Sequence, residues 1–141
     1  MYYDKKVPAD RYYDQANHIW LKPNVDNTEF EIGLDEIAVK NIGDLVYLSF
    51  DNITTSVSKG NVIGKLEASK MIDNLLVPLS GEIISLNENV IKNPSIVNED
   101  TYNSGWLFKI KPSNWQVEKE NLINPDKAEE WLIKELNSVK D

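Results

Sequence analysis

The sequence contains no cysteine, a single histidine and no long hydrophobic run. Without cysteine, the chain cannot form disulfides, thiolate metal sites or a cysteine nucleophile. The one histidine, His18, cannot form a zinc site alone. No stretch approaches the roughly 18 apolar residues that a membrane-spanning helix requires, and the first residues lack the apolar core of a secretory signal. We therefore expect a cytoplasmic protein without a metal site.

Acidic residues outnumber basic ones. The chain has 15 Lys and Arg against 23 Asp and Glu, which gives a formal net charge of −8. The basic residues are scattered, so no basic patch for phosphate contacts is predicted. We expect a monomer that binds neither nucleic acid nor an anionic membrane surface. Its acidity favours partners with basic docking surfaces.

The chain has the size and composition of one globular domain, with 141 residues of which 41% are hydrophobic. Helical spacing predicts a short helix near 34–42 and a C-terminal helix at about 125–139. Residues 1–16 are polar and Tyr-rich, and we expect them to form an extended N-terminal arm. Alternating or β-rich stretches predict strands at 18–21, 29–33, 45–50, 82–86 and 106–110. Together they predict a mainly β fold, a small sandwich or flattened barrel with appended helices.

The stretch 64–81 is predicted to be a hairpin of two apolar strands with Lys70 at its tip. Ser69 and Lys70 can be the central residues of a turn without positive φ. Glu67 lies three residues before the lysine and Asp73 three after it, so both are expected near the tip as an acidic collar. A long side chain in this position points into solvent, where another protein can reach it.

The chemistry of an exposed lysine in a turn is compatible with several functions. Lys70 can be a solvated turn residue, and the chain then a plain interaction module. Schiff-base chemistry needs a buried lysine with a lowered pKa, the opposite of an exposed amine among carboxylates. Glu67 and Asp73 could form a hydrolase pair, but an exposed hairpin does not provide the burial that such a pair needs. An attachment point for a covalent cofactor fits the pattern better, and we expect no catalytic residue.

Several segments carry a resemblance to a known family. Glu67–Lys70 followed by Val77–Ile83 resembles the lipoyl-lysine hairpin of the lipoyl/biotinyl-domain superfamily, and more closely that of the glycine cleavage H-proteins. The resemblance implies a barrel-sandwich hybrid of two small antiparallel sheets. Further segments match the family's motifs at consistent spacing: His18–Trp20, Ile32–Ala38, Asn41–Val46, Leu86–Val90, Asn93–Pro94, Val97–Asn98 and Gly105–Ile110.

The resemblance also implies a mechanism. Lipoate would be joined to the Lys70 nitrogen through an amide by a lipoate ligase or a lipoyl transferase and synthase. Glu67, Ser69 and Asp73 would be recognised around the tip. The lipoyl group would move the aminomethyl group of glycine from a PLP-dependent glycine decarboxylase (P-protein) to an aminomethyltransferase (T-protein). A dihydrolipoamide dehydrogenase (L-protein) would reoxidise it. The chain itself would be a carrier, not an enzyme.

The sequence departs from the family pattern at three places: Ala68-Ser69 stands for Ser-Val before the lysine, Leu34 for Thr, and Asp51–Ile53 for a Pro/Gly segment. An H-protein-like carrier for sulfur oxidation or lipoate relay is therefore the alternative. Lys70-Met71 also resembles part of the Met-Lys-Met motif of biotin carriers, but Ser69 precedes the lysine here. His18 is expected to be a structural hydrogen-bonder near Trp20, or a wall of a groove for the lipoyl arm.

Overall fold

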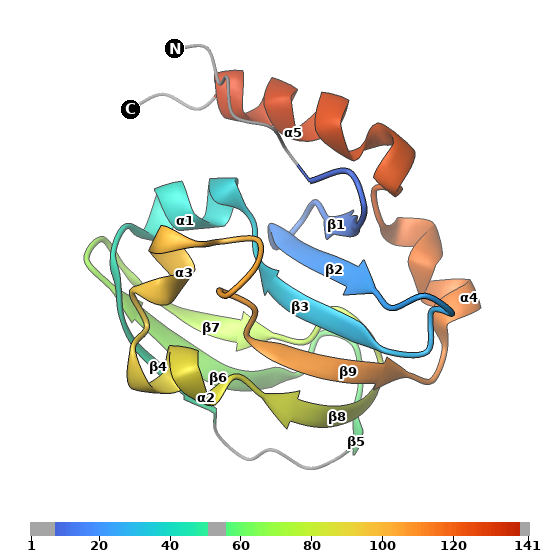
Figure 1. The fold of residues 1–141 in the computed structure, drawn as a ribbon, viewed down its shortest axis with the longest axis horizontal. Coiled ribbons are helices and arrows are strands. Elements are labelled where there is room, and N and C mark those ends of the chain that lie inside the picture. Colours follow the sequence, from blue (N-terminus) through green and yellow to red (C-terminus); the bar gives the residue numbers. More distant parts are fainter. Residues whose placement is uncertain (1–7, 51–55, 139–141) are drawn as a thin grey trace.

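The computed structural model describes residues 8–50 and 56–138, which form nine strands and several short helices (Figure 1). The strands are β1 Tyr12–Asp14, β2 Ile19–Pro23, β3 Phe30–Leu34, β4 Leu45–Phe50, β5 Ser56–Val57, β6 Val62–Ala68, β7 Ile72–Leu76, β8 Gly81–Leu86 and β9 Phe108–Pro112. The helices are α1 Glu36–Ile42, α2 Glu88–Lys92, α3 Ile96–Glu99, α4 Trp115–Glu118, the 3-10 turn Lys119–Asn121 and α5 Pro125–Ser138.

The strands form two antiparallel sheets. Six strands pair in the order β1-β2-β3-β9-β8-β5, and three pair in the order β4-β6-β7. Within the described residues these are two separate sheets, not one closed barrel. The predicted mainly β class with two antiparallel sheets, a short helix and a C-terminal helix is therefore confirmed.

The hydrophobic core has two parts. The larger cluster joins residues of both sheets, such as Ile32 and Phe108 from the large sheet and Leu48 and Leu66 from the small one. The smaller cluster covers Tyr13 and Trp20, with one face of α5 packed over β1 and β2. The buried α5 residues are Ala128, Leu132 and Leu136, whose helical spacing underlies the prediction of this helix.

Several predicted boundaries shift by one or two residues. The short helix begins at Glu36, because Leu34 ends β3 and the Asp35 side chain caps the helix by accepting from the Ala38 N–H at 3.0 Å. The last predicted strand begins at Phe108. Part of the predicted arm is strand β1, which pairs with β2. Residues 1–7, the segment 51–53 and Val139 lie outside the described residues.

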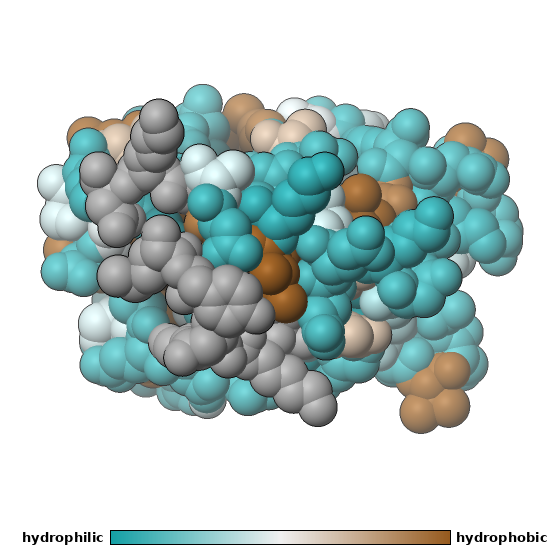
Figure 2. All heavy atoms as spheres, turned by 90° about the horizontal axis from the view of Figure 1, so that it is seen from above, coloured by the Kyte–Doolittle hydropathy of each residue, from teal (hydrophilic) through white to brown (hydrophobic). Residues whose placement is uncertain are grey.

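Seen from the side of α5, the surface consists mainly of hydrophilic residues, with hydrophobic ones in small separate groups (Figure 2). In the part of the chain that the structure describes, no helix is both long enough and apolar enough to cross a membrane.

Candidate functional site

Lys70 lies at the tip of the β6–β7 hairpin, as predicted from the sequence. The Met71 carbonyl accepts a hydrogen bond from the Ala68 N–H at 2.9 Å, which leaves Ser69 and Lys70 as the exposed turn residues. Neither has positive φ; among described non-glycine residues, only two others do. The turn therefore needs no special backbone conformation at the lysine.

The tip is fastened to the turn between α1 and β4, which lies beside it in Figure 1. The Ser69 N–H donates to the Asp44 carbonyl at 2.8 Å, and the Lys70 N–H donates to the Ile42 carbonyl at 2.9 Å. In return, the Asp44 N–H donates to Ser69 Oγ at 2.9 Å. These bonds hold the backbone of Ser69 and Lys70 in one position, although the turn itself is exposed.

Gly43 makes the close approach possible. Its φ of 81° and ψ of −149° lie in a region that residues with a side chain rarely adopt. A Cβ at this position would lie 2.3 Å from Ser69 Oγ and 3.1 Å from Lys70 Cγ. Gly43 lies in the segment Asn41–Val46 that matches a family motif, and its contact with the tip was not predicted from the sequence.

Asn98 braces this turn from another part of the chain. Its side-chain N–H donates to the Gly43 carbonyl at 2.9 Å, and its oxygen accepts from the Leu45 N–H at 2.9 Å. The amide thus satisfies backbone groups on both sides of Asp44. Asn98 lies in a segment that matches a family motif, but its role could not be predicted, since a contact between residues so far apart in the chain leaves no local signal in the sequence.

The Lys70 side chain is exposed but not free. Its Nζ donates to the Lys40 carbonyl at 3.1 Å. This carbonyl belongs to the last turn of α1, where unpaired C=O groups favour a positive charge. The expectation that the side chain simply points into solvent is therefore incomplete, because its amine lies against the end of a helix.

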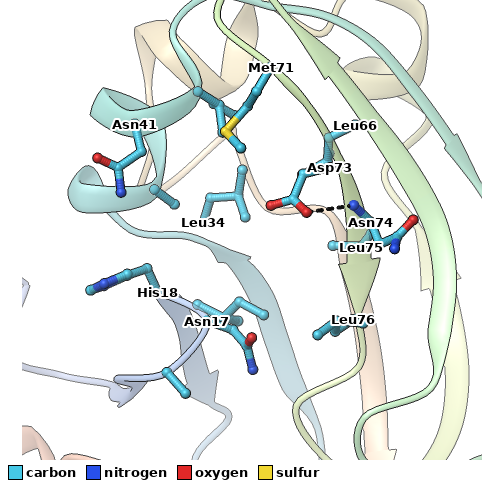
Figure 3. Close-up of a pocket in the computed structure, with 14 residues that line it drawn as sticks. Asn17, His18, Leu34, Asn41, Leu66, Met71, Asp73, Asn74, Leu75 and Leu76 are labelled. Atoms are coloured by element: carbon cyan, nitrogen blue, oxygen red, sulfur yellow. Dashed lines mark hydrogen bonds between the residues drawn. The ribbon is translucent and has the colours of Figure 1, made fainter.

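Glu67 and Asp73 lie on opposite faces of the hairpin. In the strand register Glu67 pairs with Ile72, and Asp73 pairs with Leu66. Paired residues project to the same face and successive residues alternate, so the two carboxylates point in opposite directions. The expected acidic collar is divided. Figure 3 shows Asp73 on the pocket side. The strand register places Glu67 on the outer side.

A pocket with a volume of about 600 Å³ lies beside the tip, between the hairpin, α1 and the start of β2 (Figure 3). Met71, directly after the lysine, lines its upper end, and Asp73 faces into it. The remaining lining residues are largely apolar or carry amides, among them Leu34, Leu66, Leu75, Leu76, Asn17 and Asn41.

His18 forms part of the opposite wall of this pocket. Its Nδ1 lies 3.2 Å from Oδ2 of the buried Asp35, and this hydrogen bond raises the pKa of His18. Its backbone has a φ of 54°, and its ring stacks on Trp131 of α5 at a centroid distance of 6.1 Å. The histidine thus has both expected properties, a structural hydrogen bond and a place in a groove, but its aromatic neighbour is Trp131.

The site can display an amine and shelter a group attached to it. Among the described residues, no cluster of three or more His, Cys, Asp or Glu could hold a metal ion. Two packed antiparallel sheets with a lysine at a hairpin tip define a protein of the lipoyl-domain-like class.

Comparisons with known proteins identify the family within this class. A model of the glycine cleavage H-protein family matches residues 11–135. A glycine cleavage system H protein of Carboxydothermus hydrogenoformans is 36% identical over 129 residues, or 92% of this chain and 96% of that protein. A probable glycine cleavage system H protein of Pyrococcus horikoshii is 35% identical, covering 90% of this chain and 92% of its own length.

A solved structure gives the same result. The crystal structure of a glycine cleavage system H protein from Mycobacterium marinum matches with a TM-score of 0.71 at 26% identity, over 94% of this chain and 100% of that chain. The chain belongs to the glycine cleavage H-protein family, which confirms the resemblance found in the sequence.

Proposed function

We propose that this chain is the lipoyl carrier of a glycine cleavage system and that Lys70 is its attachment site. Membership of the H-protein family is the observation that carries the proposal. The position of Lys70 supports it, since the lysine is exposed at a hairpin tip whose backbone is hydrogen-bonded to the α1–β4 turn at Ser69 and Lys70. The partners are the P-, T- and L-proteins and a lipoate-attaching enzyme, and the chemistry occurs in their active sites.

Lipoate supplies a dithiolane that can accept and release an aminomethyl group and two electrons. The protein supplies the position of the attachment point. Amide formation at Nζ removes the positive charge of Lys70 but leaves one N–H, which can still donate to a carbonyl such as that of Lys40. The hydrogen bonds of Ser69 and Lys70 to the α1–β4 turn fix the base of the arm, so the motion is confined to the side chain and the attached group.

The residues around the tip fit an apolar arm of this kind. The pocket beside Lys70 is concave, and apolar and polar groups line it in similar shares. Met71 and Leu66 provide apolar contact next to the attachment point, and Asp73 provides a carboxylate that favours a cationic amine. An arm bearing an aminomethyl group has both properties, so the pocket can shelter the loaded arm between partners.

Intact-mass measurement tests the attachment site. The full-length chain, incubated with lipoate, ATP and a lipoate ligase, should gain the mass of one lipoyl group. Lys70→Arg should gain none, whereas Lys65→Arg, which replaces an exposed lysine of the same hairpin, should be modified like the wild type. Modification of the Lys70→Arg protein would show that another lysine is the site.

A reconstituted exchange of glycine with bicarbonate by a P-protein tests the pathway. The lipoylated chain should stimulate the exchange, and the unmodified chain should not. If the chain is lipoylated but gives no stimulation, it serves another lipoate-dependent route, such as sulfur oxidation or lipoate relay.

A further inference from the structure

The outer face of the small sheet carries a row of exposed side chains directly below the lysine. Tyr47 of β4 pairs with Glu67 of β6, and Glu67 pairs with Ile72 of β7, so the three side chains lie side by side across the sheet. The register shifts between Leu45 and Tyr47, and the extra residue at this bulge, Val46, is exposed beside the row. We call Val46, Tyr47, Glu67 and Ile72 the outer row.

The outer row is unusually apolar for an exposed surface. Val46, Tyr47 and Ile72 are 63%, 53% and 65% exposed. Single exposed apolar residues are common, but a contiguous group of them marks an interaction site more often than chance. The carboxylate of Glu67, in the centre of the row, has no hydrogen bond or ion pair with any described residue. An unpaired carboxylate between apolar groups suits a partner with a basic side chain inside an apolar contact surface.

We propose that the outer row is the docking surface for the enzyme that acylates Lys70, whose matching surface is apolar with a basic residue opposite Glu67. This inference rests on the proposed function. It concerns the other face of the hairpin from Asp73 and the pocket.

The short length of the unmodified Lys70 side chain favours the acylating enzyme as the partner that docks on this row. Before modification, the reactive amine is carried only by the four-carbon side chain of Lys70, and it lies against the Lys40 carbonyl. An enzyme that forms a bond to this amine must therefore contact the protein surface around the tip. After modification, the longer arm lets the enzymes of glycine cleavage act on the lipoyl group farther from the hairpin.

The row is also placed for this contact. Ala68 and Met71 close the turn, and Glu67 and Ile72 form the next pair along the hairpin. Glu67 and Ile72 are therefore the outward-facing pair nearest to the tip. The anchored tip keeps this surface and the base of the lysine in a fixed relation, so docking on the row also positions the amine.

The acylation step balances with lipoate activated as an acyl adenylate. The Lys70 ammonium loses one proton to the enzyme or to water, and the resulting amine nitrogen forms a C–N bond with the acyl carbon. The nitrogen loses a second proton, to the enzyme, to water or to the departing phosphate, as the amide forms. The acyl–phosphate bond breaks, and AMP leaves with its electron pair. Docking supplies no part of this chemistry, and it acts by holding the amine at the acyl carbon.

Two exposed valines of the same sheet provide a matched test. Val46 belongs to the outer row, whereas Val62 is 54% exposed but lies at the opposite end of β6 from the tip. The rate of lipoate attachment to the unmodified full-length chain is measured with a lipoate ligase and ATP as kcat/KM for the protein. Val46→Ser should lower it about threefold or more, and Tyr47→Ser/Ile72→Ser at least about tenfold, because truncated anchors at interface centres have effects of this size. Val62→Ser should leave it unchanged.

Two further measurements separate the explanations. All variants should unfold at the wild-type urea midpoint, since the substituted side chains are exposed. Variants lipoylated to completion with excess ligase should support glycine–bicarbonate exchange at the wild-type rate. A wild-type kcat/KM for Tyr47→Ser/Ile72→Ser would refute the docking surface. Wild-type attachment with impaired exchange would assign the row to the glycine decarboxylase and overturn the proposal. Absence of lipoylation in the wild type itself would remove the proposed function and this inference with it.

Discussion

Replacing Gly43 with alanine should loosen the tip and slow the modification of Lys70. The φ of 81° with a ψ of −149° is strained for alanine by about 1–3 kcal/mol. The new Cβ would lie 2.3 Å from Ser69 Oγ, so the hydroxyl must move and lose its bond from the Asp44 N–H, worth about 0.5–1.5 kcal/mol. Together, Gly43→Ala should lower the free energy of unfolding by about 1.5–4.5 kcal/mol.

Gly60 provides the matched control. Its φ is 90°, but a Cβ there would meet nothing within 4 Å. Gly60→Ala should therefore lower the free energy of unfolding by the backbone strain alone, about 1–2 kcal/mol. Alanine also reduces the conformational entropy of the unfolded chain, but this stabilising effect is common to both variants. The difference in the free energy of unfolding between Gly43→Ala and Gly60→Ala, measured by urea denaturation, reports the contact with the tip together with any difference in backbone strain between the two positions.

A double variant tests whether the Ser69 hydroxyl is the group that clashes. Ser69→Ala removes the oxygen that the new methyl group would meet. The cost of Gly43→Ala/Ser69→Ala should therefore be smaller than the sum of the two single costs. In a lipoylation assay Gly43→Ala should be slower than the wild type and Gly60→Ala unchanged. Equal destabilisation by both glycine replacements, with normal lipoylation of Gly43→Ala, would refute this account of the anchored tip.

Two further predictions concern residues behind the site. The hydrogen bond with Asp35 raises the pKa of His18, so this pair stabilises the fold fully below the unfolded pKa near 6.5 and loses the contribution as the pH rises through the folded value. In urea denaturation across this range, the wild type should lose stability with rising pH and His18→Gln should lose less; equal pH dependence would contradict the assignment. Asn98→Ala removes the bonds to the Gly43 carbonyl and the Leu45 N–H and should cost about 1–3 kcal/mol of unfolding free energy, with slower lipoylation. An unchanged unfolding midpoint would show that water replaces both bonds.

The sequence was sufficient to predict the hairpin, because its signals are local. Two apolar stretches surround the polar turn at Lys70, and the apolar residues of the C-terminal helix recur at helical spacing. The short helices α2, α3 and α4 were not predicted, since four or five residues are too few to show a helical period. The pairing of Tyr12–Asp14 with β2 was also missed, because a short edge strand depends on its neighbours more than on its own residues.

The site was predicted in part. The position of Lys70 at the tip was predicted. The close approach of the tip to Gly43, and the hydrogen bonds of Asn98 to the same turn, were not, because they depend on contacts between distant segments. The relation of Glu67 and Asp73 was predictable in principle. Once Ser69 and Lys70 are the turn residues, Glu67 must pair with Ile72, and residues three before and three after the lysine fall on opposite faces. The acidic collar was expected because Glu67 and Asp73 are equally far from Lys70 in the sequence, but this does not place them on the same face of the hairpin.

The alternation of side chains along the hairpin has a functional consequence. A carrier must be recognised once by the enzyme that modifies it and repeatedly by the enzymes that use it. Because successive residues of a strand face opposite sides, β7 can present Ile72 to the outside and Asp73 to the pocket without either constraining the other. Substitutions of Ile72 should therefore affect attachment, and substitutions of Asp73 the loaded arm. The hydrogen bonds that anchor the tip keep the outer face and the pocket face of the hairpin in fixed orientations. Without them, the hairpin could rotate and the two faces would not stay separate.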